Sequence, residues 1–267
     1  MSKKIKRFIS FAFKENKIGL INIKLLLISL YYTLKAFIKR ERNVASEIYS
    51  YQSLFFIKLK EPVAFLESCR RNDSVFPKGI RGVVYKLRDE VFKVNSLLTL
   101  EIGSGPNSNL SYWVDKGLLK VIAIDPLADI YEKIMKKLNY DYPIAPIKLT
   151  GESLLKKFKE ETFHIVFTQN SLDHTKNPII CFKNAYVSLK KGGLIFVCSN
   201  MKEGTRTSWS GMHKFDIYVE DNNLLLANKK GEISNLIDEN MTTLDLVFYE
   251  TYFKNNVHSF EAVFRKN

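Results

Sequence analysis

Leu97-Leu98-Thr99-Leu100-Glu101-Ile102-Gly103-Ser104-Gly105 is the stretch that decides the fold. Its first four residues form a short β-prone run, and the two glycines that follow let the backbone turn tightly and approach a ligand closely. A second such run, 121–124, ends at Asp125, which lies twenty-two positions after Gly103. This separation suits one strand–helix unit, and a carboxylate at that strand end can accept hydrogen bonds from both hydroxyls of a ribose. The stretch therefore predicts a turn that binds a nucleoside.

The alternation of strands and helices continues along the chain. Further β-prone runs are predicted at 146–149, 165–167 and 194–198. Helical stretches separate them, at about 108–116, 127–138, 152–159 and 177–189. Two last strands, 244–252 and 259–265, flank a short turn at 254–256 and are predicted to pair as an antiparallel hairpin. We therefore expect an α/β fold with three layers: a doubly wound, seven-stranded, mostly parallel sheet with an antiparallel strand from the C-terminal hairpin.

Composition and charge narrow the classes of function. The chain has 267 residues, 46% of them hydrophobic, which suits one large domain with a short extension. Residues 1–45 hold 11 Lys and Arg against two Glu, so they carry +9 of the formal charge of +13 and leave only +4 on the rest. Because the charge belongs to the extension, we expect no nucleic-acid partner. Three widely spaced cysteines without a CxxC pattern indicate neither disulfides nor a zinc site, and favour a cytoplasmic location.

The predicted organisation has three parts. Residues 1–45 are a basic amphipathic helical extension, 46–90 a helical lead-in or cap, and 91–267 the main domain, in which 201–240 form a lid or insert over the acceptor site. The extension is not a simple membrane span, since Lys24 and Lys35 interrupt its apolar run. Two interpretations of it stay open: peripheral contact with an anionic membrane, or packing on the domain or on a partner subunit. The oligomeric state is left open.

The turn also distinguishes between classes of cofactor. Position 108 is Ser, so the turn lacks the third glycine of the nicotinamide fingerprint, and a dehydrogenase is disfavoured. Glu-x-Gly-x-Gly with a downstream Asp resembles the first two motifs of class I S-adenosylmethionine-dependent methyltransferases. Four further segments resemble later landmarks of that family, in the right order: Gly151-Glu152-Ser153, Phe163-His164-Ile165-Val166-Phe167, Ser171-Leu172-Asp173-His174 and Leu189-Lys190-Lys191-Gly192-Gly193. His164 departs from the pattern, which usually has an acid there, and is expected to be structural.

The resemblance implies a methyltransferase enzyme with S-adenosylmethionine as cofactor and S-adenosylhomocysteine as product. On the family pattern, the turn would hold the methionine moiety, Asp125 the ribose, Leu127 the face of the adenine and Glu152 its exocyclic amine. The full set of expected cofactor-binding residues is Glu101, Gly103, Ser104, Gly105, Asp125, Leu127, Gly151, Glu152, Ser153, Gln169 and Asn170.

The expected catalytic residues are His174 and His213. A hydroxyl acceptor needs a base, and histidine suits that role. His174 lies beyond the fourth strand, and His213 belongs to a polar and aromatic segment after the fifth, 207–216. Asp173, Trp209 and Asp216 are expected to contact the substrate. Asp173, His174, His213 and Asp216 offer the oxygen and nitrogen ligands of a divalent cation, but we expect no metal.

The methyl acceptor is the part of the predicted function that the sequence determines least. The favoured interpretation is O-methylation of a small molecule or of a surface-glycan (capsule) precursor. It is based on the 201–232 segment, on a Lys-, Ile- and Asn-rich composition typical of an AT-rich bacterium, and on a resemblance of Gly-Met-His-Lys-Phe-Asp at 211–216 to methyltransferases of bacterial surface-polysaccharide clusters. A membrane lipid or lipid-linked acceptor docked by residues 1–45, and a non-catalytic cofactor-binding partner protein, are the alternatives. Base methylation of nucleic acid is disfavoured, since Gln169-Asn170-Ser171-Leu172 lacks the Asn/Asp-Pro-Pro-aromatic element.

Overall fold

The computed structural model describes residues 27, 31, 34, 35, 38, 61–76, 78–141, 143–237, 241, 243–254 and 256–267. Its contacts divide into two units, and the larger unit consists of Leu66–Ala128 and Tyr142–Asn267. The predictions for the 1–45 extension and for 46–60 lie outside the described residues, apart from five exposed helical positions in the extension. Within the described part of the chain, none of the helices combines the length and apolar character needed to cross a bilayer.

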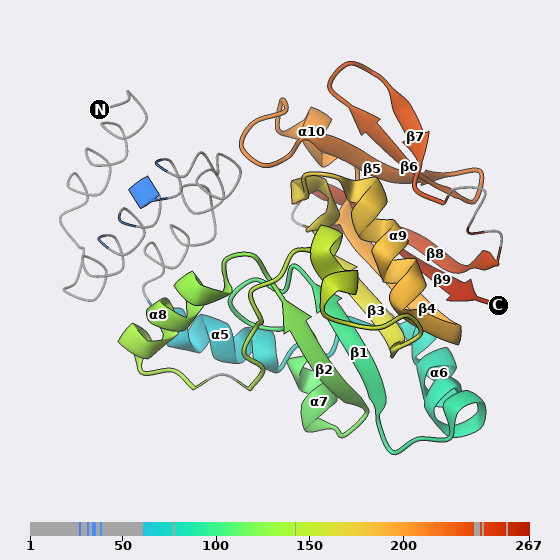
Figure 1. Ribbon diagram of the computed structural model, residues 1–267, viewed down its shortest axis with the longest axis horizontal. Coiled ribbons are helices and arrows are strands. Elements are labelled where there is room, and N and C mark those ends of the chain that lie inside the picture. The colour runs from blue at the N-terminus through green and yellow to red at the C-terminus, as the bar shows by residue number, and fades with distance from the viewer. Residues whose placement is uncertain are drawn as a thin grey trace. The chain divides into compact units, whose positions relative to one another are not determined.

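A six-stranded sheet forms the centre of the larger unit (Figure 1). Its order is β2-β1-β3-β4-β9-β8, in which β2, β1, β3 and β4 run parallel and β9 is antiparallel to both of its neighbours. The strands are β1 (Leu97–Ile102), β2 (Leu119–Ile124), β3 (Phe163–Gln169), β4 (Leu189–Asn200), β8 (Leu244–Lys254) and β9 (Val257–Lys266). The order reverses between β1 and β3, as in a doubly wound sheet. The predicted α/β fold and its antiparallel C-terminal strand are confirmed.

The outermost of the seven expected strands is reduced to a single bridge. Residues 146–149 make one parallel bridge, between Ile147 and Ile124, in place of a strand. Asp125 N donates to the Ile147 carbonyl at 3.0 Å, and Ile147 N donates to the Ala123 carbonyl at 2.8 Å.

Both faces of the sheet are buried, which explains the nearly continuous apolar runs of its strands. Alternate side chains of β3 and β4 point to opposite faces, since Ile165 and Phe196 belong to one core cluster while Val166 and Ile195 belong to the other. The first cluster packs against α6 (Lys78–Lys86), the π-helical turn Leu87–Phe92 and α7 (Ser111–Asp115). The second packs against α9 (Pro178–Ser188) and the 3-10 turn Gly151–Lys156. Helices on both faces make the three layers that were predicted.

Helix α9 begins at residues that are typical of a helix N-terminus. Helix α9 starts where Asn177 Oδ1 accepts a hydrogen bond from Ile180 N at 3.0 Å, with Pro178 at the first helical position. Helix α5 extends from Pro62 to Arg70, and helix α8 from Ala128 to Leu138. The described part of the predicted 46–90 lead-in is mostly helical, with an interruption between α5 and α6.

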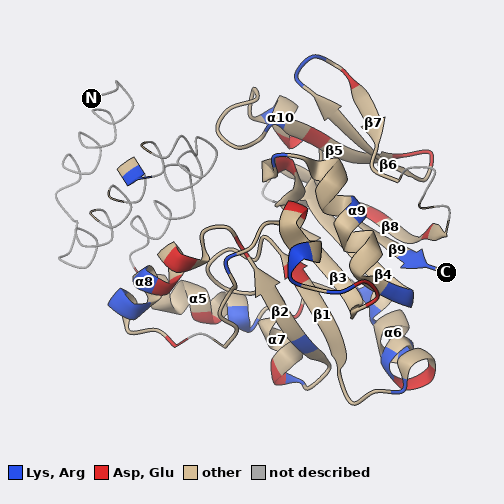
Figure 2. Ribbon diagram, viewed as in Figure 1, with Lys and Arg blue, Asp and Glu red and all other residues tan. Residues whose placement is uncertain are grey.

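Residues 201–237, the described part of the predicted lid or insert, include regular secondary structure. They contain α10 (Glu203–Arg206) and a three-stranded antiparallel sheet of β5 (Phe215–Glu220), β6 (Asn223–Asn228) and β7 (Ile233–Asn235). Ile217, Leu224 and Leu226 of this small sheet lie in the same core cluster as α9. Sequence analysis did not predict these strands. Figure 2 shows Lys and Arg interspersed with Asp and Glu over the described ribbon, in agreement with the small net charge outside residues 1–45.

Candidate functional site

The turn after β1 adopts a conformation that needs its glycines. Gly103 and Gly105 have φ of 69° and 67°, in the left-handed region that only glycine enters easily. Gly103 N donates to the Ile124 carbonyl at 2.8 Å, which ties the turn to the end of β2. A Cβ on Gly103 would lie 2.4 Å from the Cβ of Ser171, whose hydroxyl donates to the Ile102 carbonyl at 2.8 Å. The turn is therefore closely packed beneath the loop that follows β3.

Glu101 shapes the turn from inside the protein. Its carboxylate is buried and accepts hydrogen bonds from the Ser108 hydroxyl and from the backbone N and side-chain amide of Asn109, the last two at 2.9 and 3.0 Å. Burial raises the pKa of this carboxyl, and the same hydrogen bonds oppose the rise. Glu101 thus holds the 105–109 segment in place, and contact with the cofactor stays a prediction.

Asp125 lies at the end of β2, next to the turn. The buried carboxylate accepts from Gly105 N at 3.0 Å and from Leu127 N at 2.8 Å. A carboxylate oxygen can accept more than one hydrogen bond, as contacts with ribose hydroxyls would require. Asn107 Oδ1 in the same turn is buried and accepts no hydrogen bond from any described residue. An unused acceptor beside a glycine turn suits a ligand with an ammonium group, and S-adenosylmethionine carries one.

The predicted adenine-reading segment makes mainly internal contacts. Glu152 Oε1 accepts from Lys176 N at 2.8 Å and from Asn177 N at 3.2 Å, and so fixes the loop that leads into α9. A Cβ on Gly151 would lie 2.1 Å from Cys181 Sγ, so the glycine here is required by close packing against α9. Ser153 is half-buried in the same 3-10 turn.

A pocket of about 250 Å³ lies where β3 and β4 end beside the C-terminal hairpin. Its lining residues are Gln169, Asn170, Cys198, Ser199, Asn200, Tyr252, Val257 and Ser259. Asn170 Oδ1 accepts from Asn200 N at 2.8 Å, and Ser259 donates to Asn200 Oδ1 at 3.0 Å. Gln169 Oε1 is buried and has no hydrogen-bond partner among the described residues. Gln169 and Asn170, which we expected to bind the cofactor, thus line a pocket with the ends of β4 and the hairpin.

Two ionisable side chains of the pocket keep their protons. Burial raises the pKa of the Cys198 thiol well above its usual range, and the nearby charge of Glu261 raises it further. Burial and Glu261 likewise raise the pKa of Tyr252, whose hydroxyl donates to Glu261 Oε1 at 3.1 Å. Because neither group loses its proton readily, neither is suited to deprotonate a bound molecule.

The two predicted catalytic histidines lie side by side. His174 Nε2 is 3.1 Å from His213 Nδ1, and His213 Nδ1 is 2.7 Å from Asp173 Oδ2. Asp173 is buried, while the side chains of His174 and His213 are 19% and 28% exposed. The turn after β3 supplies Asp173 and His174, and the segment just before β5 supplies His213. We call these three residues the Asp–His–His cluster.

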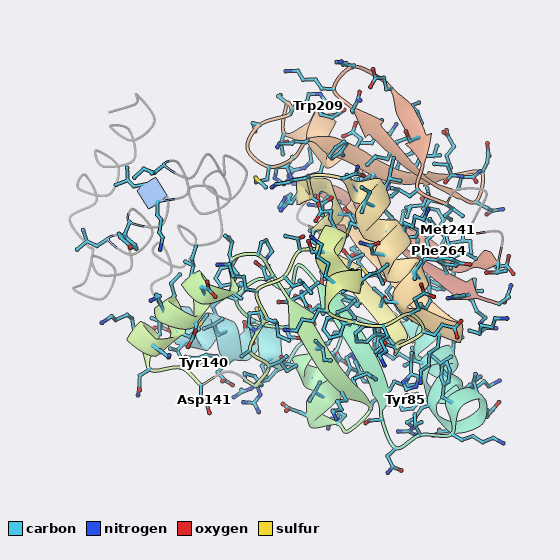
Figure 3. The ribbon with its side chains drawn as sticks, in the orientation of Figure 1. Tyr85, Tyr140, Asp141, Trp209, Met241 and Phe264 are labelled. Carbon is cyan, nitrogen blue, oxygen red and sulfur yellow. The ribbon has the colours of Figure 1, made fainter. Side chains whose placement is uncertain are left out.

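Two of the expected substrate residues, Trp209 and Asp216, make contacts within the domain, and their substrate role stays a prediction. Asp216 is buried, and its carboxylate accepts from Thr205 N at 2.8 Å and from the Thr205 hydroxyl at 2.5 Å, which fastens α10 to β5. Trp209 is half-buried beside α10 (Figure 3), where a Cβ on Gly204 would lie 2.7 Å from its ring. His164 accepts a hydrogen bond from Leu98 N at 2.8 Å, which confirms its structural role.

Other site residues were not found from the sequence. Glu203 lies 3.7 Å from His213 Nε2 and pairs with Arg206. Tyr252 and Ser259 reach the pocket only because the hairpin pairs with β4. The polar end of the fifth predicted strand, Ser199-Asn200, was the one available signal for the pocket.

Residues 100–197 match a family model described as a methyltransferase domain. No curated protein matches the chain in sequence. A solved structure of 1,6-didemethyltoxoflavin-N1-methyltransferase from Burkholderia thailandensis, with bound 1,6-didemethyltoxoflavin and S-adenosylhomocysteine, is 12% identical, with a TM-score of 0.43 over 82% of this chain and 91% of that one. The N-methyltransferase NodS from Bradyrhizobium japonicum, in complex with S-adenosylhomocysteine, is 15% identical, with a TM-score of 0.43 over 76% of this chain and 97% of that one.

The matched segment begins in β1 and ends in β4, so it contains the glycine turn, Asp125 and two members of the Asp–His–His cluster. Residues 100–197 therefore match a methyltransferase domain, which supports a methyltransferase enzyme, and the glycine turn and Asp125 within this segment suit S-adenosylmethionine as the methyl donor.

Proposed function

We propose that this enzyme methylates a hydroxyl group of a small, uncharged and polar acceptor, such as a surface-glycan (capsule) precursor. The observation that carries the proposal is the lining of the pocket at the ends of β3 and β4. Among the described residues, that lining contains amides, hydroxyls, a thiol and a valine side chain, but no Lys, Arg, His, Asp or Glu. A charged acceptor would find no opposite charge among these lining side chains, whereas a molecule with several hydroxyls would find hydrogen-bond partners.

Gln169 gives the acceptor a specific contact. Its buried Oε1 has no donor among the described residues, and an unmet buried acceptor costs about 1–3 kcal/mol. An acceptor O–H that donates to this atom would remove the cost. We therefore assign Gln169, Asn200 and Tyr252 to acceptor binding.

The chemistry assigns distinct tasks to the residues. When bound, S-adenosylmethionine supplies a methyl group on a sulfonium. Gly103, Gly105 and Asp125 hold and orient the donor, and orientation accounts for much of the rate of an in-line displacement. The acceptor hydroxyl must also lose its proton, and Cys198 and Tyr252 cannot accept it because their raised pKa values keep them protonated. We assign this step to the Asp–His–His cluster, which lies on the same loops after β3 and β4.

A direct test measures transfer of labelled methyl groups to a panel of neutral mono- and oligosaccharides and their amino analogues. We expect turnover with hydroxyl acceptors and a KM for the acceptor raised about 3- to 10-fold by Gln169→Leu and by Tyr252→Phe, since each removes one neutral hydrogen bond. Tyr249→Phe, on the same strand but outside the pocket lining, is the matched control. Preference for amino acceptors, or KM values equal to that of the control, would contradict the proposal.

The alternative acceptor, a membrane lipid or lipid-linked molecule docked by residues 1–45, concerns residues outside the described part of the chain. A bacterial source, a cytoplasmic location and peripheral contact with a membrane stay predictions from the sequence. Vesicle binding by the full chain and by a chain lacking residues 1–45 measures the membrane contact directly.

A further inference from the structure

The Asp–His–His cluster brings three potential metal-ligand atoms together from distant parts of the sequence. Asp173, His174 and His213 each offer one such atom, and all three atoms lie within 4.8 Å of one another. The two segments are joined by a backbone hydrogen bond from Lys214 N to the Asp173 carbonyl at 3.5 Å. The cluster is therefore a feature of the folded domain and not of one flexible loop.

The separations match those of neighbouring ligands around one ion. Asp173 Oδ2, His213 Nδ1 and His174 Nε2 form a triangle with sides of 2.7, 3.1 and 3.5 Å. First-row divalent cations bind such atoms at about 2.1 Å, so adjacent ligands stand about 3.0 Å apart in an octahedron and about 3.4 Å apart in a tetrahedron. The three atoms therefore fit one triangular face of a coordination sphere.

The three atoms of the triangle all carry lone pairs. Without an ion, a proton on His213 Nδ1 can be donated to Asp173 Oδ2 at 2.7 Å, and His174 Nε2 lies 3.5 Å from the same oxygen. A cation would instead accept a lone pair from all three atoms at once.

The surroundings of His213 resemble the outer shell of a metal site. Its other nitrogen, Nε2, lies 3.7 Å from Oε1 of Glu203, which is buried and paired with Arg206. Histidines that bind metals usually direct their second ring nitrogen to a carboxylate or a carbonyl, which orients the ring. Asp216, the fourth ligand considered from the sequence, is instead used by Thr205.

We propose that Asp173, His174 and His213 bind one first-row divalent transition-metal ion, with Glu203 as the outer-shell partner of His213. Two imidazoles and one carboxylate suit Zn²⁺, Mn²⁺ or Fe²⁺ better than Mg²⁺ or Ca²⁺, which prefer oxygen ligands throughout. The partial exposure of both imidazoles leaves coordination positions open to water or to another oxygen ligand. This replaces the expectation of no metal that the sequence alone supported.

The ion has a task in the reaction proposed above, and this part of the inference rests on that proposed function. An acceptor hydroxyl bound to the ion would have a lowered pKa and would release its proton to solvent water. The alkoxide oxygen then forms the bond to the methyl carbon as the carbon–sulfur bond of the donor breaks. In this reaction the two histidines act as ligands of the ion and not as free bases.

The test is metal binding by the full chain after treatment with a chelator. Titration with Zn²⁺, with Co²⁺ as a coloured substitute, is expected to give one ion per chain and a visible spectrum that indicates nitrogen and oxygen ligands. His213→Ala and Asp173→Asn should raise the Kd for Zn²⁺ about 100-fold or more, and Glu203→Gln about 10-fold or more. His258→Asn, which removes a histidine outside the cluster, is the matched control, and S-adenosylhomocysteine affinity reports whether each variant is folded.

Failure of the wild type to bind Zn²⁺ or Co²⁺ would overturn the inference. So would binding by folded His213→Ala and Asp173→Asn proteins at the affinity of His258→Asn. Metal binding without methyl transfer to any hydroxyl acceptor would refute the proposed function and leave the metal site standing.

Discussion

The closest packing in the cofactor turn leads to a sharp prediction, because Gly103 is constrained in two independent ways. Its φ of 69° is unfavourable for any residue with a side chain, and an added Cβ would lie 2.4 Å from the Cβ of Ser171. Gly117 has a similar φ of 72° but nothing within 4 Å of its virtual Cβ. Comparing Gly103→Ala with Gly117→Ala therefore separates the conformational cost from the steric cost.

The expected magnitudes follow from these two contributions. The left-handed conformation costs an alanine about 1–2 kcal/mol, and this is the whole effect expected for Gly117→Ala. Gly103→Ala adds overpacking against Ser171, which costs about 1–3 kcal/mol more. A displaced turn also moves Gly105 N away from Asp125, so we expect the Kd for S-adenosylhomocysteine to rise at least about 10-fold, equivalent to about 1.4 kcal/mol.

Urea unfolding and calorimetric binding of S-adenosylhomocysteine measure both effects. Adding Ser171→Gly to Gly103→Ala removes the clashing atoms, so the two substitutions together should destabilise less than the sum of the separate effects. The reasoning is refuted if Gly103→Ala and Gly117→Ala lose the same stability and both retain wild-type affinity for the ligand. It is also refuted if the double variant shows strictly additive losses.

Three further predictions use other contacts. Asp125→Ala leaves Gly105 N and Leu127 N without their acceptor and should weaken S-adenosylhomocysteine binding at least about 10-fold, as measured by calorimetry. The surface substitution Asp115→Ala is the control and should not change this affinity. Equal affinities of the two variants for S-adenosylhomocysteine would contradict the prediction. Burial, with Lys190 nearby, lowers the pKa of His164 from 6.5 to about 4. Between these pH values the unfolded chain binds a proton that the folded chain does not, so the free energy of unfolding should fall as the pH drops from 6.5 to 4. Urea unfolding at several pH values should show a flatter dependence for His164→Gln, and an unchanged dependence would count against this prediction. Gly151→Ala places a Cβ 2.1 Å from Cys181 Sγ and should lower the free energy of unfolding by about 1–3 kcal/mol in urea titrations. Adding Cys181→Ala should restore most of that stability. A Gly151→Ala protein of wild-type stability would refute the packing argument.

Much of the fold follows from sequence because its signals are local. Three of the predicted runs are strands buried on both faces, so their apolar character is nearly continuous. Their polar ends, at Glu101–Gly105, Asp125 and Gln169, mark one edge of the sheet. The 146–149 run makes only one bridge, to the end of β2 at the outer edge of the sheet. Strands β5–β7 were missed because their turns and polar residues resemble those of a loop, and only the shared core reveals them.

In the candidate site, too, some residues could be chosen from the sequence and others are revealed only by the fold. His174 and His213 were chosen separately, and the fold brings them to 3.1 Å from each other. Asp216 has a residue type suited to the site, but a neighbouring threonine uses its carboxylate. Glu203 could not be chosen, since nothing in a Lys-Glu-Gly segment distinguishes a surface glutamate from one that faces a histidine 10 residues later. Side-chain partners depend on tertiary contacts that a local pattern does not contain.

The small sheet β5–β7 also limits how the acceptor specificity of this enzyme can change during evolution or engineering. Ile217, Leu224 and Leu226 share their core cluster with α9, so substitutions at inward positions of these strands alter folding stability together with any effect on the substrate. The connecting segment 207–214 carries Trp209 and His213 and contributes Met212 as its buried residue. New specificities are therefore expected to arise by changes in that segment and at the pocket lining, while the strands stay conserved in apolar character.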